Sequence, residues 1–480
     1  MTDGTGTGTG TGTGAGTGTG TGAEADTEAE AGAGTRTRTR TAVRTSPARL
    51  VRGAVAMLPP GTALVGAGTA VLGLAGYVQL AVAGHVLSSD RMAGLSVLWT
   101  LVFSVGLGLF FPVEQEITRL VAARVVVGGR VAPVLRRGLA TSLLLLAVVC
   151  ALSATLARPL ADRLFDGDLA LVGALCAAFA GLSVAHVTRG VLAGTGRFRA
   201  YGFQLALDGT LRVVLSVLLA LAHVRTVLPY AAILALPTLV SVLLTGPTVI
   251  RAAGSWKGGE RLPWRALAAG LAALVPSTLL AQALVNASVV SAKLLSAADA
   301  ENAAFITALL SAVVLARVPL FVFGSLQASL LRGLSSAVAA GDRATFRQLL
   351  LRTTAFTLLL GGAGGLVAVV AGPWLVPRLF GSPHLLGAAD FAWLSGGTLL
   401  YMLASVHGQV LQTMGGHRRQ LAAWACGIAA LLVVTAAPFA VRDRVEIAYA
   451  VGAAVTEALL AGMAYVTWTQ PEGRLLRQTK

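Results

Sequence analysis

The residues best suited to chemistry are the few ionisable side chains that lie within or directly beside hydrophobic segments. The run GLGLFFPVEQEITR at 106–119 places Glu114, Glu116 and Arg119 directly after an apolar stretch. Glu116 and Arg119 are three residues apart, so on a helix they share one face and can form an ion pair. The run is either an interfacial ion pair that ends a hydrophobic span, or part of a gate whose charges separate when a cavity opens to the cytoplasm.

A weaker copy of this run stands in the second half of the chain. SLQASLLRG at 325–333 keeps an arginine, Arg332, but has Gln327 and Ser329 where the first half has glutamates. This asymmetry predicts that an acid of the first half, Glu116, pairs with Arg332 of the second half and closes a cytoplasmic gate.

Asp208 and Arg212 form a second candidate pair, since residues four apart are neighbours on a helix. A buried charge needs a partner, so they form either a neutralised structural pair or a coupling site, where Asp208 titrates when Arg212 is drawn to an anionic substrate. Glu457, within AVTEALLAG, is a further candidate for ion coupling or ion pairing. His186 and His407 lie at matching places in the two halves, and we interpret them as packing or gate-edge residues.

Arg317 is the candidate substrate-binding residue. It lies in the apolar stretch AVVLARVPLF, directly before Val318 and with no acid nearby in the sequence. An arginine in a cavity can grip phosphate with two parallel hydrogen bonds. We therefore assign Arg317, together with Arg212, to holding a diphosphate group. The alternative is an ion pair of Arg317 with Glu114, Asp208 or Glu457.

The motifs of several enzyme classes are absent from the sequence. There is no phosphate-binding Walker loop, no HExxH, no GxSxG and no paired-cysteine metal site. The three cysteines, Cys150, Cys176 and Cys426, lack metal-ligand spacing and are expected to be apolar buried side chains. We therefore expect neither an enzyme nor a cofactor or metal.

The composition is that of a membrane protein. The chain is 55% hydrophobic and 12% charged, against about 25% charged in soluble domains. Apolar runs of around 18 or more residues recur, and each can span a bilayer as a helix. We predict an all-α polytopic fold with about twelve spans. They cover roughly 61–87, 92–113, 138–157, 169–189, 204–224, 227–249, 266–291, 302–327, 351–371, 391–412, 420–441 and 446–468.

The charge distribution predicts the orientation in the cytoplasmic membrane. Most of the 37 lysines and arginines fall in the arm, the tail and alternate loops, and such an excess marks the cytoplasmic side. Both termini are therefore expected in the cytoplasm. The basic residues on the cytoplasmic side already account for the net charge of +16. This charge is therefore no sign of nucleic-acid binding, and nucleic acid is not an expected partner. The predicted parts are a disordered arm 1–58, an N-lobe 59–250, a linker 251–265, a C-lobe 266–470 and a tail 471–480.

The two halves resemble each other in three places. RPLADRLF (158–165) resembles GPWLVPRLF (372–380), and GTGRFRAYGFQ (194–204) resembles TMGGHRRQLAAW (413–424). In the third place, residues 118–145 resemble residues 331–360. Two arginines of the first copy are each followed, after the same number of residues, by an arginine of the second copy. Six predicted helices separate the copies, so the halves share one orientation and form two parallel six-helix repeats around a central cavity.

This pattern resembles the multidrug/oligosaccharidyl-lipid/polysaccharide (MOP) exporter superfamily. The likeness rests on FPVEQEITRLVAARV at the end of the second span, on the P-x-x-x-x-L-F segment from Pro159 to Phe165, and on RGVLAGTGRF with its copy QVLQTMGGHRR. The chain looks most like the actinobacterial polysaccharide-biosynthesis branch, whose relatives move lipid-linked oligosaccharides across the cytoplasmic membrane. Multidrug-extrusion members also have twelve spans, but they usually carry acidic cation sites in the N-lobe.

The resemblance implies an alternating-access flippase that moves polyprenyl-diphosphate oligosaccharide precursors across the cytoplasmic membrane for cell-surface polysaccharide biosynthesis. The implied partners are the lipid-linked saccharide, the bilayer, and a polysaccharide polymerase or glycosyltransferases. One alternative is a cation-coupled multidrug exporter of the same superfamily, in which Asp208 and Glu457 matter most. The other is a non-transporting membrane scaffold for polymer assembly.

Overall fold

The computed structural model describes residues 2–16, 61–254, 262–295, 318–380, 384–438 and 441–469, together with 308–309, 312–313 and 315–316. The chain divides into two units, Met1–Ala48 and Arg49–Lys480. Regular structure in the described residues is entirely helical and lies in the second unit. The predicted all-α fold is confirmed.

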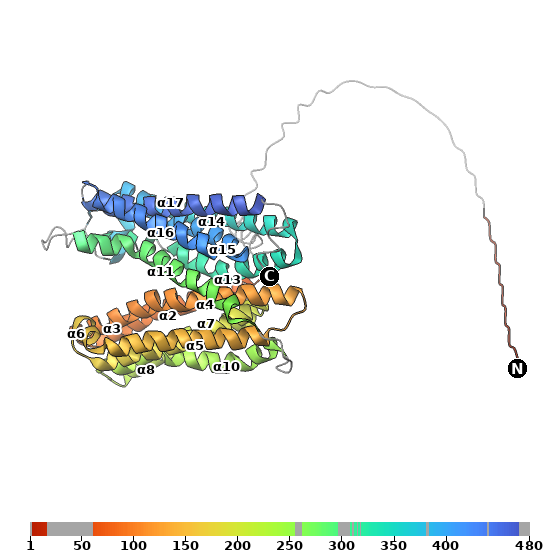
Figure 1. The fold of residues 1–480 in the computed structure, drawn as a ribbon, viewed down its shortest axis with the longest axis horizontal. Helices are drawn as coiled ribbons and strands as arrows, with labels where there is room; N and C mark the ends of the chain where they lie inside the picture. The colour runs from red at the N-terminus through yellow and green to blue at the C-terminus, as the bar shows by residue number, and fades with distance from the viewer. Residues whose placement is uncertain are drawn as a thin grey trace, which may run out of the picture. The chain divides into compact units, whose positions relative to one another are not determined.

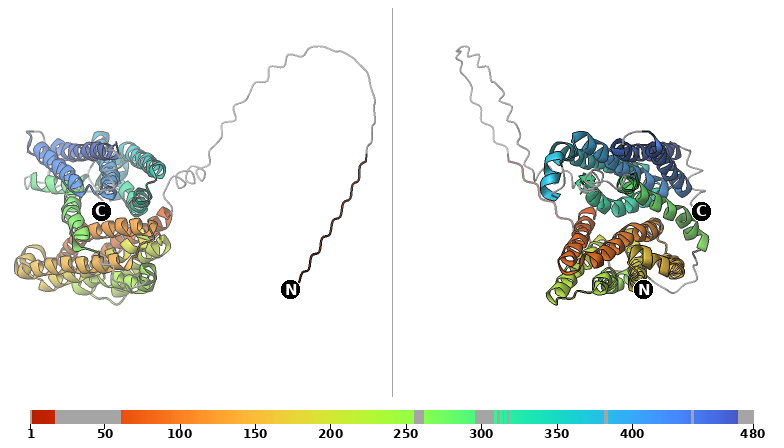
Figure 2. Two further views of the ribbon diagram at one scale, coloured as in Figure 1. Left: turned by 45° about the vertical axis from the view of Figure 1, so that its right-hand side comes forward. Right: turned by 90° about the vertical axis from the view of Figure 1, so that its left-hand side faces the viewer.

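The helices form two bundles, the N-lobe and the C-lobe, which lie next to each other in Figures 1 and 2. The N-lobe comprises α2 (Thr62–Val86), α3 (Ser89–Leu101), the π-helix η1 (Val102–Gly106), α4 (Leu107–Val126), α5 (Ala132–Thr155), α6 (Ala157–Leu164), α7 (Leu169–Gly194), α8 (Phe198–Leu221), α9 (Val227–Ala232) and α10 (Leu236–Ala253). The C-lobe comprises α11 (Trp264–Leu295), α13 (Val318–Ala340), α14 (Arg343–Phe380), α15 (Ala388–Thr413), α16 (His417–Ala436) and α17 (Val441–Thr469).

Ten helical segments of the described part are long and apolar enough to cross a membrane. The chain is thus a multi-pass membrane protein. The predicted spans 302–327 and 391–412 are not among the ten. The first overlaps α13, and part of it lies outside the described residues, while the second falls on α15. Many leucines and valines on the outside of the bundles are exposed, as expected for surfaces that face lipid.

The internal repeat is visible in the turns that follow α7 and α15. Each turn contains a glycine in the left-handed region, Gly196 with φ 74° and Gly415 with φ 75°, a conformation that costs glycine little. The P-x-x-x-x-L-F copies differ from each other. Pro159 to Phe165, which lies between the predicted spans 138–157 and 169–189, is largely helical as α6, whereas the copy at 372–380 continues α14 to its end.

Close packing of α2 against α8 depends on two glycines of α8. A Cβ atom on Gly202 would lie 2.4 Å from the carbonyl oxygen of Leu64, and one on Gly209 would lie 2.8 Å from the Cα of Leu72. Small residues let helix backbones approach within a membrane, where van der Waals packing drives association. These glycines therefore hold the two helices together.

We expect Gly202→Val to destabilise the N-lobe by about 1–3 kcal/mol, because the added methyl groups force α2 and α8 apart. The measurement is thermal unfolding of the purified protein in detergent. The matched control is Gly173→Val on α7, where a Cβ atom meets nothing within 4 Å. Equal melting temperatures for the two variants would contradict this account of α2–α8 packing.

Candidate functional site

The polar patch of Glu114, Glu116 and Arg119 lies inside the N-lobe. The second span was expected to end near 113, but α4 continues to Val126. Glu114 and Glu116 are consequently buried, with 2% and 0% of their surface exposed. They do not mark the end of a hydrophobic span, because neighbouring helices supply each carboxylate with hydrogen-bond partners.

Glu114 joins α4 to α7 and α8. Its Oε2 lies 2.7 Å from Nδ1 of His186, and its Oε1 accepts a hydrogen bond from the hydroxyl of Tyr201 at 2.5 Å. The edge of Phe111 packs against the His186 ring, with the centroids 6.1 Å apart. His186 is therefore more than the packing residue that the sequence suggested. Tyr201 gave no signal in the sequence, since its contact with Glu114 is long-range.

Asp208 is the centre of a second buried cluster. The predicted ion pair with Arg212 is present, with Nε 2.8 Å from Oδ1. Arg189 of α7 also contacts Asp208, with Nη2 3.3 Å from Oδ2, and Thr238 of α10 donates its hydroxyl to the same oxygen at 2.9 Å. Two guanidinium groups therefore share one carboxylate. Arg189 is not recognisable as a site residue from the sequence, because it stands at the end of the predicted span 169–189, where basic residues usually mark the cytoplasmic side.

Arg212 is held from several sides and is 2% exposed. Its Nη2 donates to Thr238 at 2.9 Å and to the carbonyl oxygen of Leu234 at 3.4 Å. The guanidinium lies 5.6 Å from the ring centroid of Phe103, which belongs to the π-helix η1. Such π-helical turns are frequent at functional sites.

Two buried guanidinium nitrogens in this cluster have no hydrogen-bond partner. They are Nη1 of Arg212 and Nε of Arg189. Buried polar groups are nearly always hydrogen-bonded, and an unsatisfied donor is costly. The cluster thus holds two guanidinium groups on one carboxylate and leaves two of their buried donor nitrogens without a protein partner.

Glu116 forms a contact between the lobes. Arg119 donates two hydrogen bonds to its carboxylate, from Nε at 2.9 Å and from Nη2 at 2.6 Å, so the predicted pair is present. Nε2 of His417, on α16 of the C-lobe, lies 3.3 Å from Oε2 of Glu116. Gly270 of α11 leaves room for both, because a Cβ atom there would lie 2.8 Å from Glu116 Oε1 and 2.9 Å from His417 Cδ2.

The predicted pairing of Glu116 with Arg332 is wrong. Arg332 Nε donates instead to the carbonyl oxygen of Gly194 at 3.3 Å, and its guanidinium lies 5.8 Å from the ring centroid of Phe198. The reason is that Arg119 already binds both carboxylate oxygens of Glu116. Arg332 still joins the lobes, but through the main chain and an aromatic ring.

Two further hydrogen bonds cross between the lobes. Gln412 donates to Gln115 at 3.3 Å, and the hydroxyls of Thr62 and Ser329 are 2.6 Å apart. We call this set the inter-lobe latch. It consists of the contacts Glu116–His417, Gln115–Gln412, Arg332–Gly194 and Thr62–Ser329.

The pair formed by Glu457 lies apart from these clusters, in the C-lobe. Glu457 of α17 pairs with His407 of α15, with Oε1 2.9 Å from Nδ1, and both side chains are partly exposed. Arg317 lies outside the described residues, so its assignment remains a prediction. The described residues include no group of three or more His, Cys, Asp or Glu placed to hold a metal ion. Their cysteines are free, and Cys426 is exposed rather than buried as expected.

Comparisons with known proteins find relatives over most of the chain, although no family model matches it. The uncharacterized protein Rv1510 of Mycobacterium tuberculosis (strain ATCC 25618 / H37Rv) is 27% identical over 411 residues, which cover 82% of this chain and 89% of that protein. The uncharacterized protein Mb3654 of Mycobacterium bovis is 26% identical over 398 residues, covering 81% and 88%.

Solved structures show which fold this is. The Vibrio cholerae MATE transporter VcmN in its bent form superposes with a TM-score of 0.69 at 15% identity, covering 91% of this chain and 99% of that chain. A MOP superfamily transporter from Pyrococcus furiosus, described as having a binding pocket of reverse polarity that suggests a different function for that protein, gives a TM-score of 0.70 at 13% identity, covering 87% of this chain and 96% of that chain. The chain thus has the fold of MATE and other MOP superfamily transporters.

We expect Asp208→Asn to destabilise the protein by about 3–5 kcal/mol, since it leaves two buried guanidinium groups without their carboxylate. Arg212→Gln should cost less, because Asp208 keeps Arg189 as its partner. Thermal unfolding of both purified variants in detergent measures the difference. A larger loss for Arg212→Gln than for Asp208→Asn would overturn the view that two cations share one anion.

Proposed function

We propose that this protein is an alternating-access flippase. Its substrate is a polyprenyl-diphosphate oligosaccharide, which it moves across the cytoplasmic membrane for cell-surface polysaccharide biosynthesis. Both termini lie in the cytoplasm in this proposal, and the product passes to a polysaccharide polymerase or to glycosyltransferases. The transporter fold supports the class of protein.

The observation that carries the substrate class is the pair of buried arginines that share Asp208. Arg189 and Arg212 share this carboxylate and keep two unpartnered donor nitrogens. A guanidinium binds phosphate through paired hydrogen bonds, so a diphosphate can take the spare donors while Asp208 keeps both arginines in place. In this proposal Arg317, assigned from the sequence, supplies a further cation for the diphosphate.

The inter-lobe latch serves as the cytoplasmic gate in this proposal. Glu114 and Glu116 lie two residues apart on α4, yet the first is bound within the N-lobe and the second contacts His417 of the C-lobe. Helix α4 therefore connects the buried polar groups to the lobe interface. Loss of the latch contacts would let the lobes separate on the cytoplasmic side, where the substrate enters.

A cation-coupled multidrug exporter is the second candidate, and the MATE transporter fold favours it. In that function Asp208 and Glu457 would bind or exchange a cation. Among the described residues, however, Asp208 is shared by two arginines and Glu457 is paired with His407. A cationic drug would have to displace these partners first, so we place the flippase ahead of the exporter.

We expect His417→Ala to shift the lobes toward a cytoplasm-open state, since it removes a contact worth about 1 kcal/mol. Spin labels at two exposed positions, Val127 after α4 and Arg418 on α16, report the lobe separation by pulsed electron resonance in a background without native cysteines. A longer distance should gain population in His417→Ala.

The matched test of the same gate is a charge swap, Glu116→Arg with Arg332→Glu. Because Arg332 binds a carbonyl group and not Glu116, the swap should not restore the distance distribution that Glu116→Arg alone disturbs. Restoration by the swap, or an unchanged distribution in His417→Ala, would contradict the assignment of the latch.

Deletion of the gene should cause a polyprenyl-diphosphate saccharide to accumulate, as measured by mass spectrometry of lipid extracts. Wild type should clear it. We expect Arg212→Lys to clear it about tenfold more slowly, because lysine keeps the charge next to Asp208 but loses the planar fork that grips phosphate. Arg317→Ala should fail in the same way.

The control for this experiment is Arg347→Gln, which removes an exposed arginine at the start of α14 and should clear the lipid normally. Absence of lipid accumulation together with increased sensitivity to cationic drugs would favour the exporter. Normal clearance by both Arg212→Lys and Arg317→Ala would reject the diphosphate site.

A further inference from the structure

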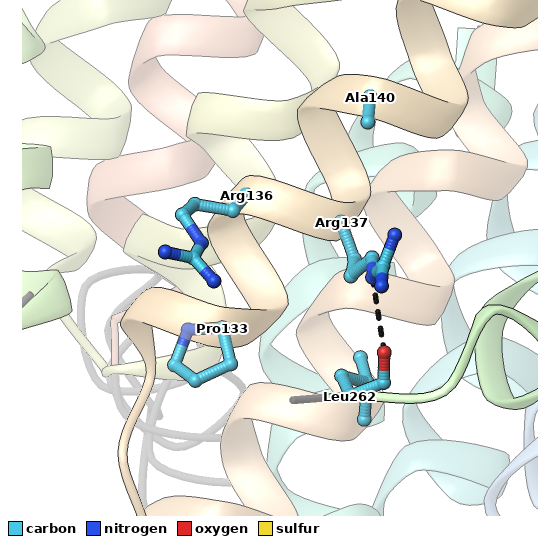
Figure 3. A pocket seen from close by; sticks show the side chains of 5 residues that line it. All are labelled: Pro133, Arg136, Arg137, Ala140 and Leu262. Carbon is cyan, nitrogen blue, oxygen red and sulfur yellow. Dashed lines mark hydrogen bonds between the residues drawn. The ribbon is translucent and has the colours of Figure 1, made fainter. Parts of the chain in front are cut away.

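A small cavity lies where the first turns of α5 meet the segment that enters α11. Its volume is about 230 Å³, and it is lined by Pro133, Arg136, Arg137, Ala140 and Leu262. Figure 3 shows the two guanidinium groups beside this cavity, one on each side of the α5 backbone turn above Pro133. No candidate function considered above uses these residues.

The two arginines differ in how they are held. Arg137 is half-buried and fixed, because its Nε donates to the carbonyl oxygen of Leu262 at 3.0 Å and its guanidinium lies 4.5 Å from the ring centroid of Trp264. Arg136 is exposed, and no hydrogen bond or ion pair is found for it within the described part of the chain. The cavity thus offers one preorganised cation and one cation free to close over a ligand.

The surroundings place this cavity at a membrane interface. Trp264 is 44% exposed, and exposed tryptophans at the ends of membrane helices sit at the level of the lipid headgroups. The basic end of α5 is also the end that the charge distribution assigns to the cytoplasm, where the leaflet is rich in anionic lipid.

An apolar track continues from the cavity along α5. Ala140, Leu143, Leu144 and Ala147 follow Arg136 at helical spacing on the same face. Leu143 and Leu144 are 44% and 58% exposed. A cationic pocket at the interface with an exposed aliphatic face next to it matches an anionic phospholipid, whose phosphate and acyl chains would occupy the two parts.

We propose that Arg136 and Arg137 form a binding site for the phosphate of an anionic phospholipid, whose acyl chains lie along α5. The headgroup bridges α5 of the N-lobe and the segment at Leu262 that leads into α11 of the C-lobe. Bound lipid thereby fixes the junction between the lobes. The site is separate from Asp208 and does not depend on which substrate the protein carries.

Native mass spectrometry of the full-length protein in detergent tests the proposal, with dioleoyl phosphatidylglycerol and dioleoyl phosphatidylcholine as probes. Wild type should retain phosphatidylglycerol in preference to phosphatidylcholine. The variant Arg136→Gln/Arg137→Gln should bind phosphatidylglycerol about tenfold more weakly, since each arginine adds attraction to an anionic headgroup. Arg136→Lys/Arg137→Lys should keep most of the preference and shows that the variant positions tolerate substitution.

The control variant is Arg347→Gln, an exposed arginine at the corresponding end of α14, which should bind phosphatidylglycerol like wild type. Equal retention of the two lipids by wild type, or an unchanged preference in the double glutamine variant, would overturn the proposal. Displacement of phosphatidylglycerol by inorganic phosphate at millimolar concentration would also overturn it, because the site would then recognise a free anion and not a lipid.

Discussion

The fold of the N-lobe depends on the neutralisation of Asp208. A single carboxylate holds Arg189 of α7, Arg212 of α8 and Thr238 of α10, so three membrane helices converge on one buried charge. Charges inside a membrane protein are costly and are tolerated where they pair with one another. The lobe therefore cannot rearrange these helices independently, and it behaves as one body built around an ion cluster.

Local pairs could be predicted from the sequence, while the long-range partners could not. The spacing of Glu116 with Arg119 and of Asp208 with Arg212 follows from helix geometry alone, and both pairs are present. The hydropathy pattern likewise predicted the helical fold. Tyr201, however, reaches its partner only after the lobe has folded, and no sequence spacing encodes such a contact. Arg189 was missed because charge counting treats a basic residue near a helix end as exposed to the cytoplasm.

The internal repeat conserves backbone geometry more than chemistry. Gly196 and Gly415 produce the same left-handed turn after α7 and α15, since the chain path demands that conformation. Side chains diverge between the lobes, and the glutamates of α4 have no counterpart in α13. The described N-lobe consequently buries its charges among three or four helices, whereas His407 and Glu457 in the C-lobe form a simple, partly exposed pair. Two lobes of similar fold thus carry different electrostatic properties.

The polar contacts within the N-lobe differ in strength from those between the lobes. Inside the N-lobe, Glu114 and Asp208 have hydrogen bonds as short as 2.5 and 2.8 Å. Between the lobes, three of the four latch contacts are single interactions at 3.3 Å. Lipid supplies no hydrophobic drive to hold helix surfaces together, so these few contacts and the packing beside them keep the lobes closed. The polar contacts between the lobes are therefore weaker than the ion cluster around Asp208, and the two lobes are joined mainly by apolar packing of α4 against residues such as Leu267, Leu271 and Ala328.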